Sequence, residues 1–187
     1  MVDSSANRVI PLRSDMPQYC PGRPRPGYAY RRGLNPHPTR NPGGHSYGHT
    51  PPPVTALPPG NWRENEDYLY GIDLYHEGYL WESHEAWEGL WKTCPGGSVQ
   101  AAFYRALILN SAAQIKLREH NLAGARRLSG NAFAYLKEVA AASSTFMGLD
   151  LQTLSQQFET YYGPLWRLQD PPEGYPPRFG LQIRPVS

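Results

Sequence analysis

The feature that most limits what this chain can fold into is the distribution of its prolines. Thirteen of the 20 prolines lie in residues 1–60 and five lie after residue 170, so that only Pro95 and Pro164 interrupt the 110 residues between. Proline removes a backbone donor and clashes with the preceding helical turn, so helices are expected where prolines are scarce. We therefore predict a helical domain over residues 62–170, preceded by a disordered basic Pro/Gly-rich arm at 1–61 and followed by a Pro-rich tail at 171–187.

Charge divides the chain near the same boundaries. Residues 1–60 carry seven Arg and two Asp, whereas residues 61–170 carry nine Lys or Arg and thirteen acidic residues. Strong nucleic-acid binding needs Lys and Arg concentrated on a folded face, because phosphate contacts supply most of the affinity. We therefore expect no nucleic-acid binding by the helical domain. The arm offers weak contacts to RNA through its basic and aromatic side chains, which are Arg23, Arg25, Tyr28, Tyr30, Arg31 and Arg32.

The cysteines and the hydropathy pattern predict the compartment. Cys20 lies in the arm and Cys94 in the helical domain, an arrangement that favours reduced thiols over a disulfide. The first thirty residues contain no apolar run of signal-peptide length, and the longest strongly apolar stretch of the domain, residues 106–109, is far too short to span a bilayer. We therefore predict a soluble, cytoplasmic protein that does not bind membranes.

Hydrophobic periodicity and capping residues divide the domain into about five helices. Two are expected at about 65–77 and 80–92, and the others begin at residues suited to cap a helix, namely Ser98, Asn121 and Asp150. The helix that follows Ser98 is apolar over most of its circumference and belongs at the centre. No strand-like alternation competes with these assignments. The predicted fold class is all-α, a compact bundle in which two helical hairpins of similar design precede a C-terminal helix.

Two stretches of the domain resemble a known family. Residues 78–91 read Gly-Tyr-Leu-Trp-Glu-Ser-His-Glu-Ala-Trp-Glu-Gly-Leu-Trp, which is similar to the signature of the domain-of-unknown-function family 309. The later stretch 117–136, with Asn121, Gly124 and Arg127, is similar to the second half of that family. Together the two stretches cover most of the helical domain. The resemblance implies a small helical fold, and it implies no reaction because none is established for the family.

His84, Glu85 and Glu88 form the motif most suggestive of chemistry. Residues four apart lie on one helical face, so His84 and Glu88 are neighbours. In one class of zinc enzymes two His at this spacing bind the metal and an intervening Glu acts as base; here Glu88 stands at the second position. One helix supplies two or three ligands at most, so His76 or Glu77 is a candidate to complete a site. No nucleophile elbow, phosphate-binding glycine loop or cysteine-rich zinc pattern is present.

Three interpretations of this cluster stay open. His84 is satisfied structurally by Glu88 or by Asn110 of the central helix, or the cluster lines a ligand pocket, or it is a metal-dependent or acid–base catalytic site. Asn110 lies on an apolar face and needs a partner, which is either a loop carbonyl or a ligand. Tryptophans here either fill the core or form a ligand platform. The candidate pocket residues are His84, Glu85, Trp87, Glu88, Trp91 and Asn110.

The function predicted from these features is a non-enzymatic module that binds a small molecule or a partner protein through this groove. We expect no cofactor, unless His84 and Glu88 hold a metal ion. One alternative is a metal-dependent hydrolase with His84 and Glu88 as ligands and Glu85 as base. A second alternative is that the basic arm tethers a passive bundle to RNA or to an assembly.

Overall fold

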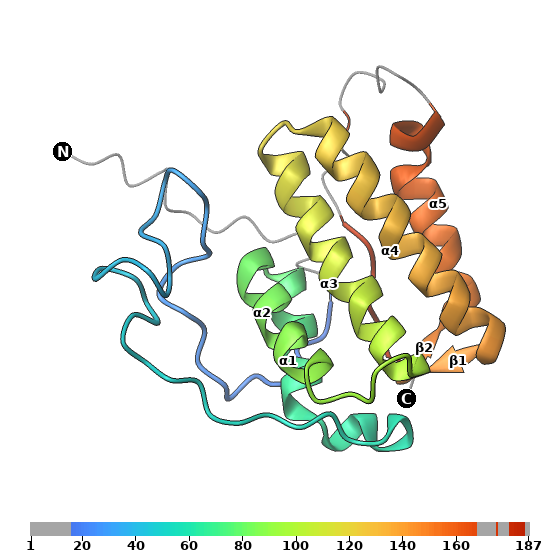
Figure 1. Cartoon of the computed structure of the whole chain (residues 1–187), viewed down its shortest axis with the longest axis horizontal. Coiled ribbons are helices and arrows are strands. Elements are labelled where there is room, and N and C mark those ends of the chain that lie inside the picture. The colour runs from blue at the N-terminus through green and yellow to red at the C-terminus, as the bar shows by residue number, and fades with distance from the viewer. Residues whose placement is uncertain (1–15, 168–174, 176–179, 186–187) are drawn as a thin grey trace.

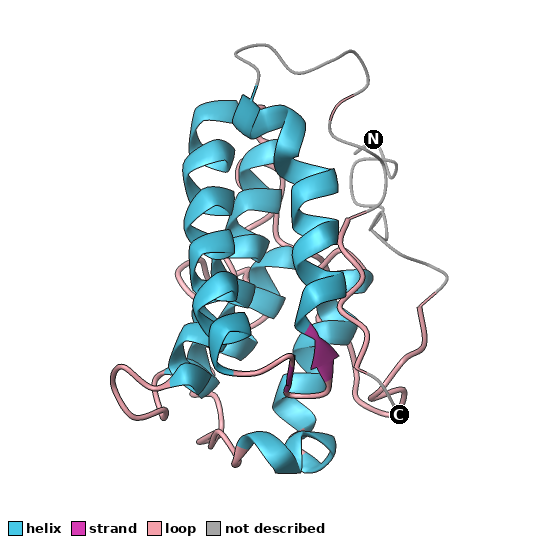
Figure 2. Ribbon diagram, turned by 90° about the vertical axis from the view of Figure 1, so that its right-hand side faces the viewer, coloured by secondary structure: helices cyan, strands magenta, loops and turns pink. Residues whose placement is uncertain are grey.

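The computed structural model of the chain describes residues 16–167, residue 175 and residues 180–185. Its helices follow one another in the order η1 (Pro59–Glu64), α1 (Glu66–His76), α2 (Leu80–Trp91), α3 (Val99–Arg118), α4 (Leu122–Ala142) and α5 (Leu151–Arg167). Each of the five α-helices packs beside the next, and α3 lies between the α1–α2 pair and α4 (Figure 1). Figure 2 shows the long helices side by side in one bundle. The predicted all-α fold is confirmed.

Short polar side chains determine where the helices begin. Ser98, Asn121 and Asp150 each accept a hydrogen bond from the backbone amide three residues further on, which satisfies a donor that has no partner within the helix. Asn65 does the same at the start of α1. The three predicted caps are therefore confirmed.

The two helical hairpins share a design at their turns. α1 ends in a Schellman motif, in which Gly78 adopts a φ of 89° and the Tyr79 amide donates to the Leu74 carbonyl over 2.8 Å. α3 ends in the same hydrogen-bond pattern, with His120 at a φ of 55° in the place of glycine. The counterpart of Gly78 in the second hairpin is thus His120.

Replacing His120 with Gly is expected to raise the free energy of unfolding by about 0.5–1 kcal/mol, because a side chain with a Cβ is strained in the left-handed region. The His120 side chain is exposed, so little packing is lost with it. Urea unfolding measures the change. Gly78→Ala is the matched control and is expected to lower stability. A destabilised His120→Gly variant would contradict this account of the turn.

A small β-hairpin, which the sequence did not predict, joins α4 to α5. Strand β1 (Thr145–Phe146) pairs antiparallel with β2 (Leu149–Asp150), and both residues of the connecting turn, Met147 and Gly148, have positive φ. That geometry suits the right-handed twist of a hairpin. Two-residue strands are too short to show alternation in a sequence. A Cβ on Gly148 would lie 2.5 Å from the Trp62 ring, so glycine allows η1 to pack against the turn.

Trp87 of α2 is the largest fully buried side chain of the core. Its indole Nε1 donates to the Tyr68 carbonyl of α1 over 3.2 Å, and a Cβ on Gly71 would collide with the ring. Glycine at position 71 therefore lets α1 approach α2 closely. α3 buries most of its circumference, as predicted for the central helix.

Residues 16–46, which we call the strap, pack across α1 and α2. Both carboxylate oxygens of Asp73 accept hydrogen bonds from the strap backbone, at the amides of Tyr19 and Cys20. Arg25 pairs with Glu77 at 2.7 Å. Residues 16–46 of the predicted arm therefore contact the bundle, where Asp73, Glu77 and Glu82 accept from the amides and side chains of the basic chain. Residues 1–15 lie outside the described part.

Part of the predicted C-terminal tail also returns to the bundle. The Ile183 amide donates to His76 Nε2 over 3.2 Å, and the Gln182 amide donates to the Gln157 side chain over 2.6 Å. Leu181 and Ile183 are buried, so residues 180–185 close the space between α1 and α5. Residues 168–174, 176–179 and 186–187 of the predicted tail and domain end lie outside the described residues.

Two further features bear on the predicted compartment. Cys20 in the strap and Cys94 after α2 are free thiols, as predicted. Within the described residues, no helix combines the length and the apolar character that crossing a bilayer requires. The cytoplasmic location stays a prediction.

Candidate functional site

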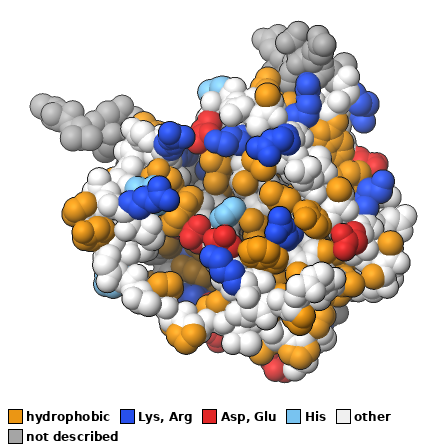
Figure 3. Space-filling model, viewed as in Figure 1, with side chains coloured by type: hydrophobic (Ala, Val, Ile, Leu, Met, Phe, Trp, Pro, Cys, Tyr) orange, Lys and Arg blue, Asp and Glu red, His pale blue; other side chains and the backbone are white. Residues whose placement is uncertain are grey.

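His84, Glu85 and Glu88, which we call the α2 cluster, lie together on α2. Each offers one ligating atom, and these atoms lie within 4.8 Å of one another. Glu85 is exposed, and the other two residues are half-buried. Figure 3 views the face formed by α2 and α3, and near its centre a His side chain lies beside acidic side chains, with Lys or Arg and hydrophobic side chains around them. Sequence spacing predicted this grouping.

The backbone of α3 orients the His84 ring. His84 Nδ1 lies 3.3 Å from the Ile108 carbonyl oxygen. Because a carbonyl only accepts hydrogen bonds, Nδ1 carries the proton and Nε2 keeps its lone pair when the ring is neutral. Burial lowers the pKa of His84, which favours that neutral form. The predicted structural partners of His84 were Glu88 and Asn110; the hydrogen-bond partner is instead the backbone of Ile108.

The carboxylates of the α2 cluster carry negative charge that the neighbouring residues only partly balance. Partial desolvation of its carboxylate raises the pKa of Glu85, and the nearby charge of Glu88 raises it further. Glu88 forms an ion pair with Lys92 at 3.2 Å, and the Lys92 side chain is 61% exposed. Such an exposed pair is worth little and is easily exchanged for another cation. Glu85 and Glu88 therefore place two acidic groups beside the His84 ring, with the exposed Lys92 amine next to Glu88.

The two tryptophans predicted beside the cluster have different places. Trp91 lies one turn after Glu88 and is half-buried, with the Arg105 guanidinium 4.9 Å from its ring centroid. Trp91 therefore belongs to the surface next to the cluster. Trp87 is fully buried in the core, so the prediction that it lines a pocket is wrong. Its side chain faces α1, where the indole contacts Tyr68 and Gly71.

Asn110 belongs to a buried network rather than to the surface cluster. Its Oδ1 accepts from the Tyr162 hydroxyl of α5 over 2.8 Å, and Tyr162 in turn accepts from Gln114 Nε2 over 3.0 Å. Gln114 Oε1 accepts from the Tyr161 hydroxyl over 3.1 Å. The sequence predicted that Asn110 and His84 line one groove. Instead, Asn110 bonds to α5 in the interior, whereas His84 bonds to the backbone of α3. The partner of Asn110 is the Tyr162 side chain, whereas the sequence had suggested either a loop carbonyl or a ligand.

The other members of this network were not predicted from the sequence. Gln114 follows Asn110 by four residues, so the two polar side chains share one face of α3. That repeat was a usable signal for a polar stripe in an apolar helix. The pairing with α5 carried no local signal, because Tyr162 is 52 residues from Asn110.

Neither candidate for completing the α2 cluster reaches it. His76 Nε2 accepts from the Ile183 amide, and Glu77 pairs with Arg25 of the strap. On a helical wheel Glu82 falls on the polar side of α2, away from the apolar stripe. It is buried, accepts from the Tyr30 amide over 2.9 Å and faces His45 Nε2 at 3.1 Å. The strap therefore covers the side of α2 that helical periodicity alone marks as solvent-exposed.

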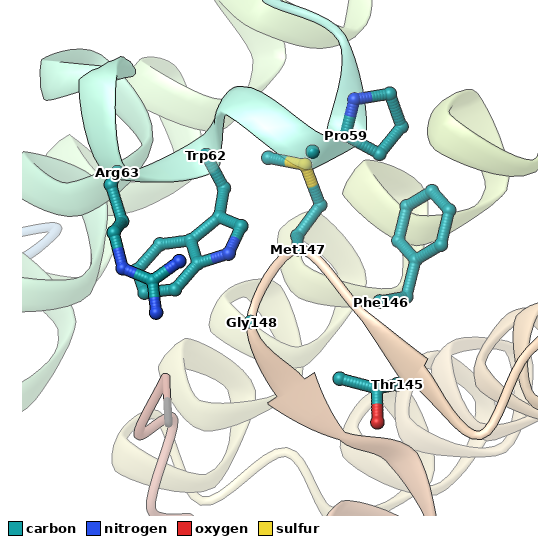
Figure 4. A pocket seen from close by; sticks show the side chains of 8 residues that line it. Pro59, Trp62, Arg63, Thr145, Phe146, Met147 and Gly148 are labelled. Atoms are coloured by element: carbon teal, nitrogen blue, oxygen red, sulfur yellow. The ribbon is translucent and has the colours of Figure 1, made fainter. Parts of the chain in front are cut away.

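A hollow of about 330 Å³ lies between η1 and the β-hairpin (Figure 4). The Trp62 ring, with the Arg63 guanidinium 4.2 Å from its centroid, lines one side, and Phe146 and Met147 lie across from it. A neighbouring hollow of about 350 Å³ shares Trp62 and Arg63 and includes Arg184. Sequence reasoning missed both hollows, because their walls come from segments far apart in the chain. Their walls contain none of the predicted site residues.

Comparison with known proteins supports the resemblance noted in the sequence. Residues 68–128 match the DUF309 family, which is described as a domain of unknown function. The matched stretch runs from α1 into α4 and contains the whole α2 cluster. No curated protein matches the chain.

Proposed function

We propose that this protein, which matches the DUF309 family over residues 68–128, is a non-enzymatic binding module whose α2 cluster holds a divalent transition-metal ion. The observation that carries the proposal is the 3.3 Å contact between His84 Nδ1 and the Ile108 carbonyl. Histidines that bind metals nearly always donate their other ring proton to a carbonyl or carboxylate, which fixes the ring and exposes the ligating nitrogen. Two carboxylates lie beside that nitrogen-bearing ring on the same helix.

The donor set suits a first-row transition metal. One imidazole and two carboxylates combine nitrogen and oxygen ligands of intermediate softness, as zinc, iron and manganese accept. Bonds of about 2.0–2.2 Å require ligating atoms roughly 3 Å apart. The candidate ligating atoms of His84, Glu85 and Glu88 lie within 4.8 Å of one another. Metal binding therefore requires small rotations of the Glu85 and Glu88 side chains that bring these atoms closer together. Glu88 must leave Lys92 in the process.

The position of Glu85 favours binding over hydrolysis. The hydrolase alternative assigns Glu85 as the base that activates a metal-bound water. Its carboxylate lies among the ligating atoms, where it acts as a third ligand, and not at a separate position suited to a base. The neighbouring Trp91 and Arg105 give the metal a rim that a partner's aromatic or acidic group can contact.

The alternative that the arm tethers the bundle to RNA has less support. Two of its four candidate arginines are engaged within the chain, since Arg23 pairs with Asp67 and Arg25 with Glu77. Contacts with phosphate would have to compete with these pairs.

Isothermal titration calorimetry of the tag-free full chain with Zn²⁺ and with Mn²⁺ tests the proposal. We expect one metal equivalent per chain and at least a tenfold weaker affinity for His84→Ala, because the oriented ligand is lost. His49→Ala is the matched control, since His49 is exposed and lies outside the cluster. Near-ultraviolet circular dichroism verifies that the variants are folded. Equal affinity of the wild type and His84→Ala, or no binding by either, would reject the proposal.

Replacing Lys92 with Met is expected to tighten metal binding by about two- to fivefold, because an exposed ion pair of up to about 1 kcal/mol no longer competes for Glu88. The same calorimetric titration measures the change. Lys137→Met removes the same charge from the exposed face of α4 and serves as the control. If both variants gain affinity equally, the effect comes from net charge and not from release of Glu88.

A further inference from the structure

Polar contacts join the strap to α1 and α2 along much of its length. Asp73 accepts two backbone amides at 2.8 Å each, and Arg25 donates to Glu77 through two nitrogens at 2.7 Å. Arg23 pairs with Asp67 at 2.8 Å. Further along the strap, the Tyr30 amide and His45 reach Glu82. The α1–α2 surface therefore recognises this segment through backbone amides and arginine side chains.

Apolar and aromatic contacts add to this attachment: Tyr19 and Cys20 pack against the bundle core, and the ring centroids of Tyr30 and His37 lie 5.8 and 5.7 Å from that of Trp81 on α2. Within residues 16–46 only Ala29 and Pro38 are fully buried. Salt weakens the exposed pair of Arg23 with Asp67, whereas the pair of Arg25 with the buried Asp73 carboxylate is screened much less. The five α-helices bury their own core, which includes Trp87 and the apolar residues of α3. Release of the strap thus leaves most of the bundle core intact.

The segment that connects the strap to the bundle is suited to act as a spacer. Residues 47–53 are all exposed and contain three consecutive prolines at positions 51–53. Pro-rich segments stay extended and behave as semi-rigid spacers, so they hold a released strap away from the bundle. This geometry lowers the tendency of the strap to fold back on its own chain.

We propose that the strap exchanges between molecules, so that the α1–α2 surface of one copy binds residues 16–46 of a second copy. Every contact described above is available to the strap of either copy, because the two surfaces are identical. Exchange of identical elements is a low-cost route to dimers for this reason. Within one chain the strap is favoured only by its local concentration, and this advantage falls as the protein concentration rises.

A fluorescent peptide of residues 16–33 probes the surface in the full chain. In the Arg25→Ala chain the intramolecular strap is weakened while Asp73 and Glu77 are unchanged. We expect fluorescence anisotropy to show at least tenfold tighter peptide binding by this variant than by the wild type. Arg32→Ala is the control, since Arg32 is exposed, and it should match the wild type. A peptide that carries the Arg25→Ala change should not bind.

Complementation tests exchange between whole chains. An equimolar mixture of Arg25→Ala and Glu77→Ala contains one intact strap and one intact surface in different molecules. Light scattering after size-exclusion chromatography should detect a heterodimer in the mixture, and monomers in each variant alone. Circular dichroism confirms that both variants are folded. The proposal is overturned if the Arg25→Ala chain does not bind the peptide, or if the mixture stays monomeric.

Discussion

Trp87→Ala is expected to lower the free energy of unfolding by about 3–5 kcal/mol, which is the usual cost of removing a large aromatic side chain from a core. The Trp87 side chain is fully buried, and its Nε1 donates to the Tyr68 carbonyl. Its removal leaves a cavity where α1 and α2 touch, because Gly71 has no side chain to fill the space. Denaturant unfolding followed by far-ultraviolet circular dichroism measures the loss.

Trp91→Ala is the matched control, since Trp91 lies on the same helix but is only half-buried. A partly exposed side chain is expected to cost about 1 kcal/mol or less on truncation. If Trp91→Ala destabilises the protein as much as Trp87→Ala, then Trp91 carries more of the core than its exposure indicates. If Trp87→Ala is nearly neutral, the contact between α1 and α2 does not depend on the indole.

Asp73→Ala is expected to lower the free energy of unfolding by about 3 kcal/mol, because it removes one partner of a buried ion pair. The Asp73 side chain is 0% exposed and its partner Arg25 is 17% exposed. Two backbone amides, of Tyr19 and Cys20, lose their acceptor at the same time. Amide hydrogen exchange should show faster exchange at both positions, and urea unfolding gives the free energy.

Asp67→Ala provides the comparison within the same strap contact. The Asp67–Arg23 pair has side chains that are 28% and 36% exposed, and exposed pairs contribute at most about 1 kcal/mol. We therefore expect a small loss of stability and unchanged exchange at Tyr19 and Cys20. Equal losses for the two variants would mean that the buried Asp73 contact is no stronger than the surface pair.

Features that depend on neighbours in sequence could be predicted. Helical periodicity and the caps at Ser98, Asn121 and Asp150 are local, so the five helices followed from them. The α2 cluster followed from the spacing of His84 and Glu88 on one helix. In each of these cases the residues concerned lie within one or two helical turns of each other.

Features that depend on distant segments could not be predicted. Glu82 looks solvent-exposed on a helical wheel, and it is buried only because Tyr30 and His45 of the strap lie over it. The partner of His84 is a backbone carbonyl, and every residue has such a group, so no residue type signals it. Opposite charges on the arm and the domain were visible in the sequence, but charge alone does not show which residues meet.

The network of Asn110, Gln114, Tyr161 and Tyr162 has a consequence for the relative position of two helices. Apolar side chains tolerate several alignments of α5 against α3, because contacts between them have no fixed direction. Hydrogen bonds do not share that tolerance. A slide of α5 by one turn, about 5.4 Å, would leave the Tyr162 hydroxyl and the Asn110 carbonyl oxygen without partners in an apolar interior. Four polar side chains thus select one alignment of these helices among many that bury a similar apolar area.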